Sequence, residues 1–448
     1  MLHKLLFKIG YLLKRPNVLR YYRQFIKTQY EPYELQKGRQ EERLRKLINF
    51  AYNNVPYYTK LFKGNNINPK DIKTVENLEK MPILTKQIIK QNWQDFIPKN
   101  INKIKYLNGS TGGSTGAPLK YRMSKKDYEI GCALLYRGWG NAGYKLGDKI
   151  AMMGGSSLVP NIKSNLKTKI QDFFLNFRHY SSFGMSEKNL LDYFNDINRW
   201  RPKFIRGYAS SIYLFAKFID ENNLKLKCKI EAIFTTAEKL FKKQRQFIEK
   251  ALGTSVFDNY GLNDGGISSY ECKNHYGMHI DTERAILETI NSNDKQIIEQ
   301  QGKILATSLY NYAMPFIKYD TGDMGIISDS ECACGRKTLL LKEIIGRVTD
   351  TLKLNNIIIG SPVLTVLMGK FDIEQYQIVQ NNKTSIIIKI VQGKTYDKEI
   401  NEGYIKASFY SHVGKINIKF DYVSSISTTE AKKYKFIINN LKKQTKLA

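Results

Sequence analysis

The sequence predicts an α/β protein in which a large N-terminal domain of mainly parallel sheets flanked by helices precedes a small α+β C-terminal lid domain. Two observations predict this class. From about residue 145, short apolar runs that end in glycine or polar residues alternate with longer helical stretches. Such alternation favours parallel strands covered by helices on both faces. After Arg347 the pattern changes to a shorter set of strands and helices.

The predicted elements follow in order along the chain. Residues 1–95 are predicted as a helical region packed on the large domain, with turns at Pro56, Pro69 and Pro82. The large domain is assigned to residues 96–346 and the lid domain to residues 347–448. In the large domain the predicted strands are 147–155, 202–208, 230–238 and 254–261, the predicted helices are 187–200, 210–222 and 239–252, and residues 278–330 are more β-like. In the lid domain the predicted strands are 386–393 and 415–423, and the predicted helices are 397–411 and 430–444.

Composition excludes a disordered protein, because 42% of the 448 residues are hydrophobic and 12% are aromatic. The formal net charge is +30, from 71 Lys and Arg residues against 41 Asp and Glu residues. Such an excess suits nucleic acid, a membrane surface or an anionic ligand. The chain is also rich in Asn, Ile and Lys, and genome base composition can produce such a lysine excess without selection for binding. The lysines are spread along the whole chain, which argues against a dedicated nucleic-acid-binding protein.

No apolar run reaches the roughly 18 to 20 residues that span a bilayer. The N-terminus is not a clean secretory signal, because Lys8 interrupts its apolar stretch. Together with only five cysteines, this predicts that the protein resides in the reducing cytoplasm and is not held by disulfides. Leu5, Leu6 and Ile9 share one helical face with further leucines, and no acidic residue precedes Glu31. This helix would either pack on its own domain or lie on the anionic inner face of a membrane.

Residues 108–118, Asn-Gly-Ser-Thr-Gly-Gly-Ser-Thr-Gly-Ala-Pro, are the most informative stretch. Four glycines and four hydroxyl residues fill positions 109–116. Glycine permits positive φ, so backbone N–H groups and hydroxyls could converge on a phosphate; a flexible surface turn is the alternative. The patterns G-x-x-x-x-G-K-[ST] and G-x-G-x-x-G are absent, which indicates neither a P-loop NTPase nor a dinucleotide-binding turn.

Three motifs follow this loop in the order Tyr260-Gly261-Leu262-Asn263-Asp264, Tyr319-Asp320-Thr321-Gly322-Asp323 and Gly346-Arg347-Val348-Thr349-Asp350. Together the four resemble T-S-G-T-T-G-x-P, Y-G-x-T-E, Y-x-T-G-D and G-R-x-x-D of the adenylate-forming acyl-CoA synthetase superfamily. Residues 45–86 and 181–190 resemble the phenylacetate–CoA ligase branch and its relatives encoded with capsular polysaccharide biosynthesis. The resemblance runs from about residue 40 to the C-terminus.

The resemblance implies a site for ATP, AMP, Mg²⁺ and coenzyme A. Asp323 would accept hydrogen bonds from the ribose hydroxyls, Arg347 would face the ribose or the phosphates, and Tyr260 would stack near the adenine. The expected phosphate loop consists of Ser110, Thr111, Gly112, Gly113, Ser114, Thr115 and Gly116. Glu238, Asn259 and Gly261 complete the expected nucleotide site.

Several positions depart from the family pattern. The pair Asn263-Asp264 stands where the family has Thr or Ser before Glu; Asp264 would still be an oxygen ligand for Mg²⁺, one methylene shorter. Lys432 aligns with the family's catalytic lysine, and Lys433 and Lys435 are its rivals. Thr349-Asp350 would be the hinge of the lid, and Asn355-Asn356 replaces a usual glycine.

A second cluster is independent of ATP. Cys272 and His279 are spaced as C-x₆-H, and Cys332 and Cys334 as C-x-C. Three thiolates and one imidazole form a closed structural zinc set, and the phenylacetate–CoA ligase branch carries a similar pairing. His275 is the competing ligand, and buried free thiols are the alternative.

The resemblance predicts an AMP-forming ligase that activates a carboxylic acid with ATP and transfers the acyl group to coenzyme A. An adenylating acyltransferase acting on a sugar or another acceptor in surface polysaccharide biosynthesis is an alternative. A non-catalytic basic nucleic-acid-binding protein on the same fold is a further one. The sequence leaves open the acid, the acceptor and the oligomeric state.

Overall fold

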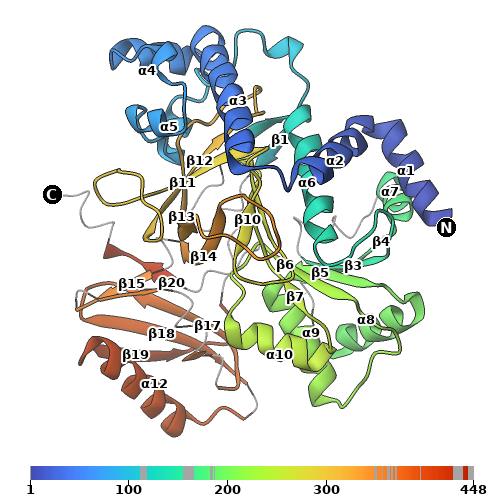
Figure 1. Ribbon diagram of the computed structural model, residues 1–448. Coiled ribbons are helices and arrows are strands. Elements are labelled where there is room, and N and C mark those ends of the chain that lie inside the picture. Colours follow the sequence, from blue (N-terminus) through green and yellow to red (C-terminus); the bar gives the residue numbers. More distant parts are fainter. Residues whose placement is uncertain are drawn as a thin grey trace. The chain divides into compact units, whose positions relative to one another are not determined.

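The computed structural model describes residues 2–110, 119–154, 166–181, 185, 187–347, 351–355, 357–360, 364, 367–368, 371–393, 395–426 and 437–441. The chain separates into two compact units, and Figure 1 labels their helices and strands. Unit 1 comprises Met1–Gly109, Tyr121–Thr321 and Ile326–Glu343, and unit 2 comprises Ser110–Lys120, Gly322–Gly325 and Ile344–Ala448. Within the described ranges, no helix combines the length and the apolar character that a membrane crossing needs.

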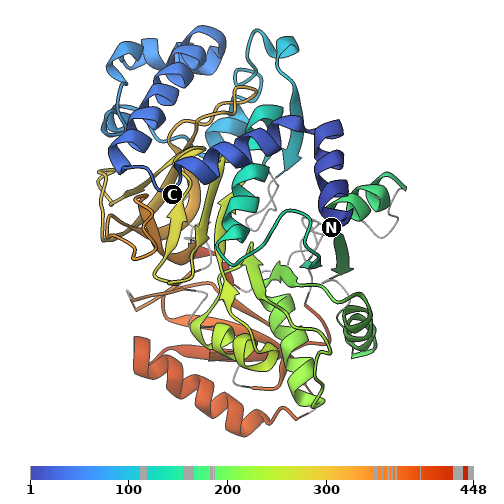
Figure 2. The same ribbon diagram turned by 45° about the vertical axis from the view of Figure 1, so that its right-hand side comes forward.

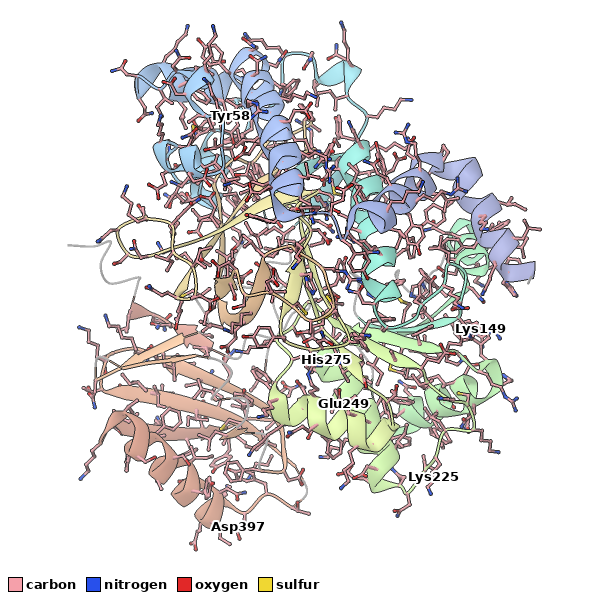
Figure 3. The ribbon with its side chains drawn as sticks, in the orientation of Figure 1. Tyr58, Lys149, Lys225, Glu249, His275 and Asp397 are labelled. Carbon is pink, nitrogen blue, oxygen red and sulfur yellow. The ribbon has the colours of Figure 1, made fainter. Side chains whose placement is uncertain are left out.

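The first hundred residues of unit 1 are mainly helical, as predicted. The helices are α1 (Leu2–Lys14), α2 (Pro16–Thr28), α3 (Tyr33–Asn54), α4 (Pro56–Gly64) and α5 (Lys86–Gln91), with 3₁₀ turns at Pro69–Asp71, Glu76–Lys80 and Ile101–Lys103. Pro56 occupies the first turn of α4, where its missing N–H costs nothing. Tyr58 is fully buried; its hydroxyl donates to the Pro315 carbonyl and accepts from the Ile317 N–H, both at 3.0 Å. These bonds fix α4, on which Figure 3 labels Tyr58, to the segment that leads into β13 (Tyr319–Ser328).

Helix α1 packs within unit 1 through two aromatic side chains. Phe7 and Tyr11 are buried, and the Tyr11 hydroxyl lies 2.6 Å from the Tyr136 hydroxyl of α6 (Lys125–Gly140). Leu5 and Ile9 are instead exposed, at 56% and 37%. The helix thus packs on its own domain, one of the two positions expected for it, with Phe7 and Tyr11 in the core. Membrane contact by the exposed face stays a prediction.

A five-stranded parallel sheet forms the centre of unit 1. Its order is β4-β3-β5-β6-β7, and every neighbouring pair is parallel. The strands are β3 (Ile150–Gly154), β4 (Phe177–Ser181), β5 (Phe204–Tyr208), β6 (Ala232–Thr236) and β7 (Val256–Phe257), and the connecting helices are α7 (Leu166–Leu175), α8 (Glu187–Trp200), α9 (Ala209–Glu221) and α10 (Lys242–Leu252). The alternating strands and helices confirm the predicted α/β class.

The two faces of this sheet bury two separate cores, because successive side chains of a strand point to opposite sides. On β3, Ile150 and Met152 join a core with residues of α1, α2 and α6. Ala151 and Met153 join the core formed with α8, α9 and α10. Figures 1 and 2 show the two groups of helices on either side of the strands.

A seven-stranded sheet has the order β11-β12-β13-β14-β10-β9-β8. Its strands are β8 (Asn259–Leu262), β9 (Ile267–Glu271), β10 (Met278–Ile280), β11 (Ala285–Ile290), β12 (Gln301–Ser308), β13 (Tyr319–Ser328) and β14 (Leu340–Arg347). Strands β8, β9, β10 and β14 pair antiparallel, as do β11 and β12. A separate pair, β1 (Tyr106–Ser110) and β2 (Lys120–Ser124), flanks residues 111–118.

Unit 2 contains the hairpin β15 (Thr351–Leu354) and β16 (Ile357–Gly360) and a four-stranded sheet of order β19-β18-β17-β20. Helix α12 (Lys398–Val413) packs Ile405 and Phe409 into one core with the strands β17 (Ile373–Gln380), β18 (Ser385–Gln392) and β19 (Asn417–Tyr422). The predicted helix over 430–444 is wrong where the structure describes it. Residues Ile437–Asn439 form β20, which pairs parallel with β17 because Ile437 completes the buried core.

Candidate functional site

Several predicted nucleotide-site residues lie where the parallel strands end, the usual ligand position in such sheets. Tyr208 ends β5, and Glu238 follows β6 by two residues. A hydrogen bond of 2.9 Å connects the two strand ends: Glu238 Oε2 accepts it from the backbone N–H of Ser210, in the first turn of α9. Ala237 adopts φ +65°, a left-handed conformation that is rare outside glycine. This turn aims Glu238 back at the strand ends.

The second motif begins on β8, beside β6 and β9. Asn259, Tyr260 and Gly261 pair with Tyr270, Ser269 and Ser268 of β9. The Ser269 hydroxyl donates to the Tyr260 carbonyl at 3.2 Å. The predicted adenine-side residues are therefore held on a regular strand.

Asp264, the predicted Mg²⁺ ligand, follows β8 and is 4% exposed. Its Oδ2 accepts a 2.7 Å hydrogen bond from the hydroxyl of Tyr319, which is fully buried and opens the third motif. The structure thus joins two motifs that lie 55 residues apart. Mg²⁺ usually takes one or two carboxylates together with substrate phosphates, so a buried carboxylate with one oxygen engaged fits this role.

Asp323 lies on the same face of β13 as Tyr319. The burial pattern of β13 alternates from Tyr319 onward, and Thr321 and Asp323 are buried at the matching positions. Side chains two and four residues apart share one face of a strand. Asp323, at 6% exposure, is therefore presented on the face whose first side chain contacts Asp264.

The remaining nucleotide-site predictions are only partly described. Ser110 ends β1, and Arg347 ends β14 directly after Gly346, whose φ is +118°. Thr111, Gly112, Gly113, Ser114, Thr115 and Gly116 lie outside the described residues, as do Thr349, Asp350, Lys432, Lys433 and Lys435. Their roles stay predictions.

The four predicted metal ligands come together. The ligand atoms of Cys272, His279, Cys332 and Cys334 all lie within 4.8 Å of one another. The sulfurs of Cys272 and Cys332 are 3.6 Å apart, and Cys334 Sγ is 3.2 Å from His279 Nε2. With Zn–S bonds of about 2.3 Å, a tetrahedral site separates its sulfurs by about 3.8 Å. The donor set therefore fits a zinc ion.

The surroundings of the cluster leave the His279 ring able to bind a metal. His279 Nδ1 lies 3.1 Å from the Thr338 hydroxyl, which leaves Nε2 turned to the sulfurs. Burial, with the charges of Arg336 and Arg137, lowers the pKa of His279 to about 4, so its ring stays neutral. Burial raises the pKa of Cys272 to about 12, a cost that a bound cation would offset.

His275, the competing ligand, is not part of this group. Its Nδ1 lies 3.0 Å from Glu271 Oε2 and 3.3 Å from Arg245 Nη1. The sequence could not decide between the two histidines, because both follow Cys272 within seven residues. Only the pairing of β10 with β9 and β14 decides it, since that pairing turns His279 toward the cysteines.

One acidic residue of the strand ends escaped the sequence reasoning. Asp258 follows β7, and its Oδ1 accepts hydrogen bonds from the Thr235 hydroxyl at 2.6 Å and the Asn259 N–H at 3.0 Å. Burial, together with the charge of Glu271, raises the pKa of Asp258 to about 7. In the sequence, only its position directly before Asn259, a predicted nucleotide-site residue, could have indicated a place in the site.

Comparisons with known proteins agree with the motifs. The C-terminal domain family of CapK matches residues 326–440. Protein CapK of Staphylococcus aureus is 28% identical over 90% of this chain and 89% of its own length. A phenylacetate-coenzyme A ligase of Thermus thermophilus is 23% identical over 83% of this chain and 84% of its own length.

Solved structures show the same fold. A 2-hydroxyisobutyryl-CoA ligase in its postadenylation state, in complex with an acyl-AMP, superposes with a TM-score of 0.73 at 16% identity, covering 94% of this chain and 92% of that one. An o-succinylbenzoate coenzyme A synthetase of Bacillus subtilis in complex with AMP gives 0.52 at 13% identity, covering 73% and 67%. The resemblance carried by the four motifs is thus confirmed: CapK and the phenylacetate-CoA ligases are homologues of this chain, and its structural neighbours are adenylate-forming CoA ligases.

Proposed function

We propose that this protein is an AMP-forming ligase that activates a carboxylic acid with ATP and transfers the acyl group to coenzyme A. The observation that carries the proposal is the 2.7 Å hydrogen bond from Tyr319 to Asp264, which couples two of the four motifs, with Asp323 on the same strand face. The names of the relatives support it, since several are phenylacetate-coenzyme A ligases.

The proposed reaction has two steps. An oxygen of the acid's carboxylate attacks the α-phosphorus of ATP, pyrophosphate leaves, and an acyl-adenylate forms. A thiolate then attacks the acyl carbon and AMP leaves. Both steps need charge neutralisation and positioning more than covalent help from the protein.

Each motif has a proposed role in the first step. The loop 110–116 would hold the β- and γ-phosphates, Asp323 would orient the ribose, and Arg347 would face the ribose or phosphates. Asp264 would hold Mg²⁺, which neutralises phosphate charge when bound. Lys432 would reach the α-phosphate.

A second acceptor has a specific observation in its favour. The CapK relative covers 90% of the chain, and the CapK C-terminal family matches residues 326–440, a range that includes most of the predicted lid. In that range Asn355, with φ +44°, donates through Nδ2 to the Val413 carbonyl at 2.9 Å. A side chain stands where relatives have a glycine, so the second-step surface differs. A sugar amine or hydroxyl could therefore replace the thiol as acceptor.

The test is ATP–pyrophosphate exchange over a panel of carboxylic acids. One acid should support exchange in the parent protein, and Asp323→Ala should abolish it. Asp329→Ala, which removes an exposed carboxylate just beyond β13, should leave the exchange rate unchanged. AMP release that requires coenzyme A supports the ligase, whereas AMP release that requires an amino sugar supports the alternative. Absence of exchange with every acid would refute both.

A further inference from the structure

A cavity of about 570 Å³ lies in unit 1, away from the residues discussed so far. Its walls come from α2, from residues 103–105 before β1, from the first turn of α6 and from the loop that carries Tyr310 and Tyr312. None of the residues proposed for ATP or metal lines it. Cavities of this size accommodate small organic ligands.

The lining is strongly cationic. Five of its side chains are basic: Arg20, Lys103, Lys105, Lys125 and Lys126. Its single carboxylate, Glu129, accepts a 3.1 Å hydrogen bond from Asn17. Among the residues that the structure describes, none of the five cations has a carboxylate within 4 Å. The five side chains are exposed, and within the described part of the chain no carboxylate pairs with them.

Lys126, one of the lining cations, lies near other positive charges, including two from outside the lining. Lys126 Nζ lies 5.0 Å from the centre of the Tyr310 ring, and the Arg43 guanidinium lies 5.5 Å from the same centre. Burial, followed by the charges of Arg20, Arg43 and Lys46, lowers the pKa of Lys126. An anion in the cavity would relieve this repulsion.

We propose that this cavity binds a small phosphorylated ligand with at least two negative charges. Ammonium groups bind phosphate oxygens as flexible point charges. The side chains of Tyr310 and Tyr312 add aromatic surface to the lining, although the Tyr310 ring already contacts Lys126 and Arg43. The helix α6 begins here, after Ser124 caps it by accepting from the Asp127 N–H at 3.3 Å, so its positive end also favours an anion. The ligand site is independent of the proposed ligase reaction.

Isothermal titration with uridine diphosphate and with inorganic tripolyphosphate tests the site. One saturable site is expected, with affinity that falls as salt rises. The double variant Lys105→Glu/Lys126→Glu should weaken binding about tenfold or more, because it reverses two charges that face the ligand. The matched control Lys225→Glu/Lys227→Glu makes the same change in net charge on exposed lysines after α9, where Figure 3 labels Lys225.

The outcomes separate this site from the nucleotide site. Asp323→Ala should leave both probes bound with unchanged affinity, since Asp323 does not line the cavity and belongs to the proposed ATP site. The proposal is overturned if neither probe binds at physiological salt, if the two double variants lose affinity equally, or if Asp323→Ala abolishes binding. Loss of ATP–pyrophosphate exchange alone would bear on the ligase and not on this cavity.

Discussion

Replacing Tyr319 with Phe removes one hydroxyl from the interior, and the structure allows its effect to be worked out. Tyr319 is fully buried, Asp264 is 4% exposed, and the hydroxyl donates to the carboxylate at 2.7 Å. A buried hydrogen bond to a charged group contributes about 1.5–3 kcal/mol, and its loss leaves the carboxylate poorly solvated. Tyr319→Phe should therefore lower the free energy of unfolding by about that amount in urea titrations. The matched control Tyr276→Phe, at a residue 48% exposed, should change it by less than about 0.5 kcal/mol.

Asp264→Asn separates the structural role of this pair from its chemical role. The amide oxygen still accepts the Tyr319 hydrogen bond, so the unfolding free energy should change by only about 1 kcal/mol. The charge that would hold Mg²⁺ is gone, so ATP–pyrophosphate exchange should fall about a hundredfold or more. The reasoning is refuted if Tyr319→Phe unfolds at the same urea concentration as the parent while Asp264→Asn keeps full exchange activity.

Three further predictions concern the metal cluster and two buried charges. Metal analysis should find about one zinc ion per chain in the parent protein. The zinc content should fall in Cys334→Ser but not in Cys228→Ser, whose thiol lies outside the cluster. Equal zinc content in the two variants would contradict a zinc site at the cluster. Burial raises the pKa of Glu288 from the ordinary glutamate value of 4.5 to about 7, so ionisation of Glu288 opposes folding as the pH rises through this range. Glu288→Gln should therefore raise the free energy of unfolding by up to about 3 kcal/mol above pH 7 and leave it unchanged below about pH 4.5. A difference in unfolding free energy that does not depend on pH would contradict this prediction. Arg284→Met leaves the fully buried Asp127 carboxylate without its 2.8 Å ion pair and should lower the free energy of unfolding by about 3–5 kcal/mol. The control Arg199→Met, which breaks an ion pair on the surface, should lower it by less than about 1 kcal/mol. Equal losses in the two variants would contradict a stabilising role for the buried ion pair.

The elements predicted best from the sequence are those whose burial is decided locally. Helix α8 begins and ends at the predicted residues because Leu190, Phe194 and Ile197 recur at helical spacing and are all buried. Strand β20 was missed because its role depends on a distant partner. Ile437 pairs with Ile378, 59 positions earlier in the chain, and a short basic segment gives no local sign of that pairing.

The candidate site divides in the same way. The motif residues Asp264 and Asp323 could be assigned from spacing and family resemblance, but the bond from Tyr319 that joins their motifs could not. Asp258 was missed because one carboxylate among many carries no pattern; its burial and hydrogen bonds appear only when β6 and β7 lie side by side. Family resemblance thus supplies residue roles, whereas tertiary contacts supply the environments that set their chemistry.

The most direct test of the proposed function is to detect the acyl-adenylate itself. Protein incubated with ATP, Mg²⁺ and the acid selected by exchange, without any thiol or sugar acceptor, should yield acyl-AMP by mass spectrometry, with one pyrophosphate released for each molecule formed. Asp323→Ala should yield neither product. Hydrolysis of ATP to ADP and phosphate, or AMP formation that does not depend on the acid, would contradict the account.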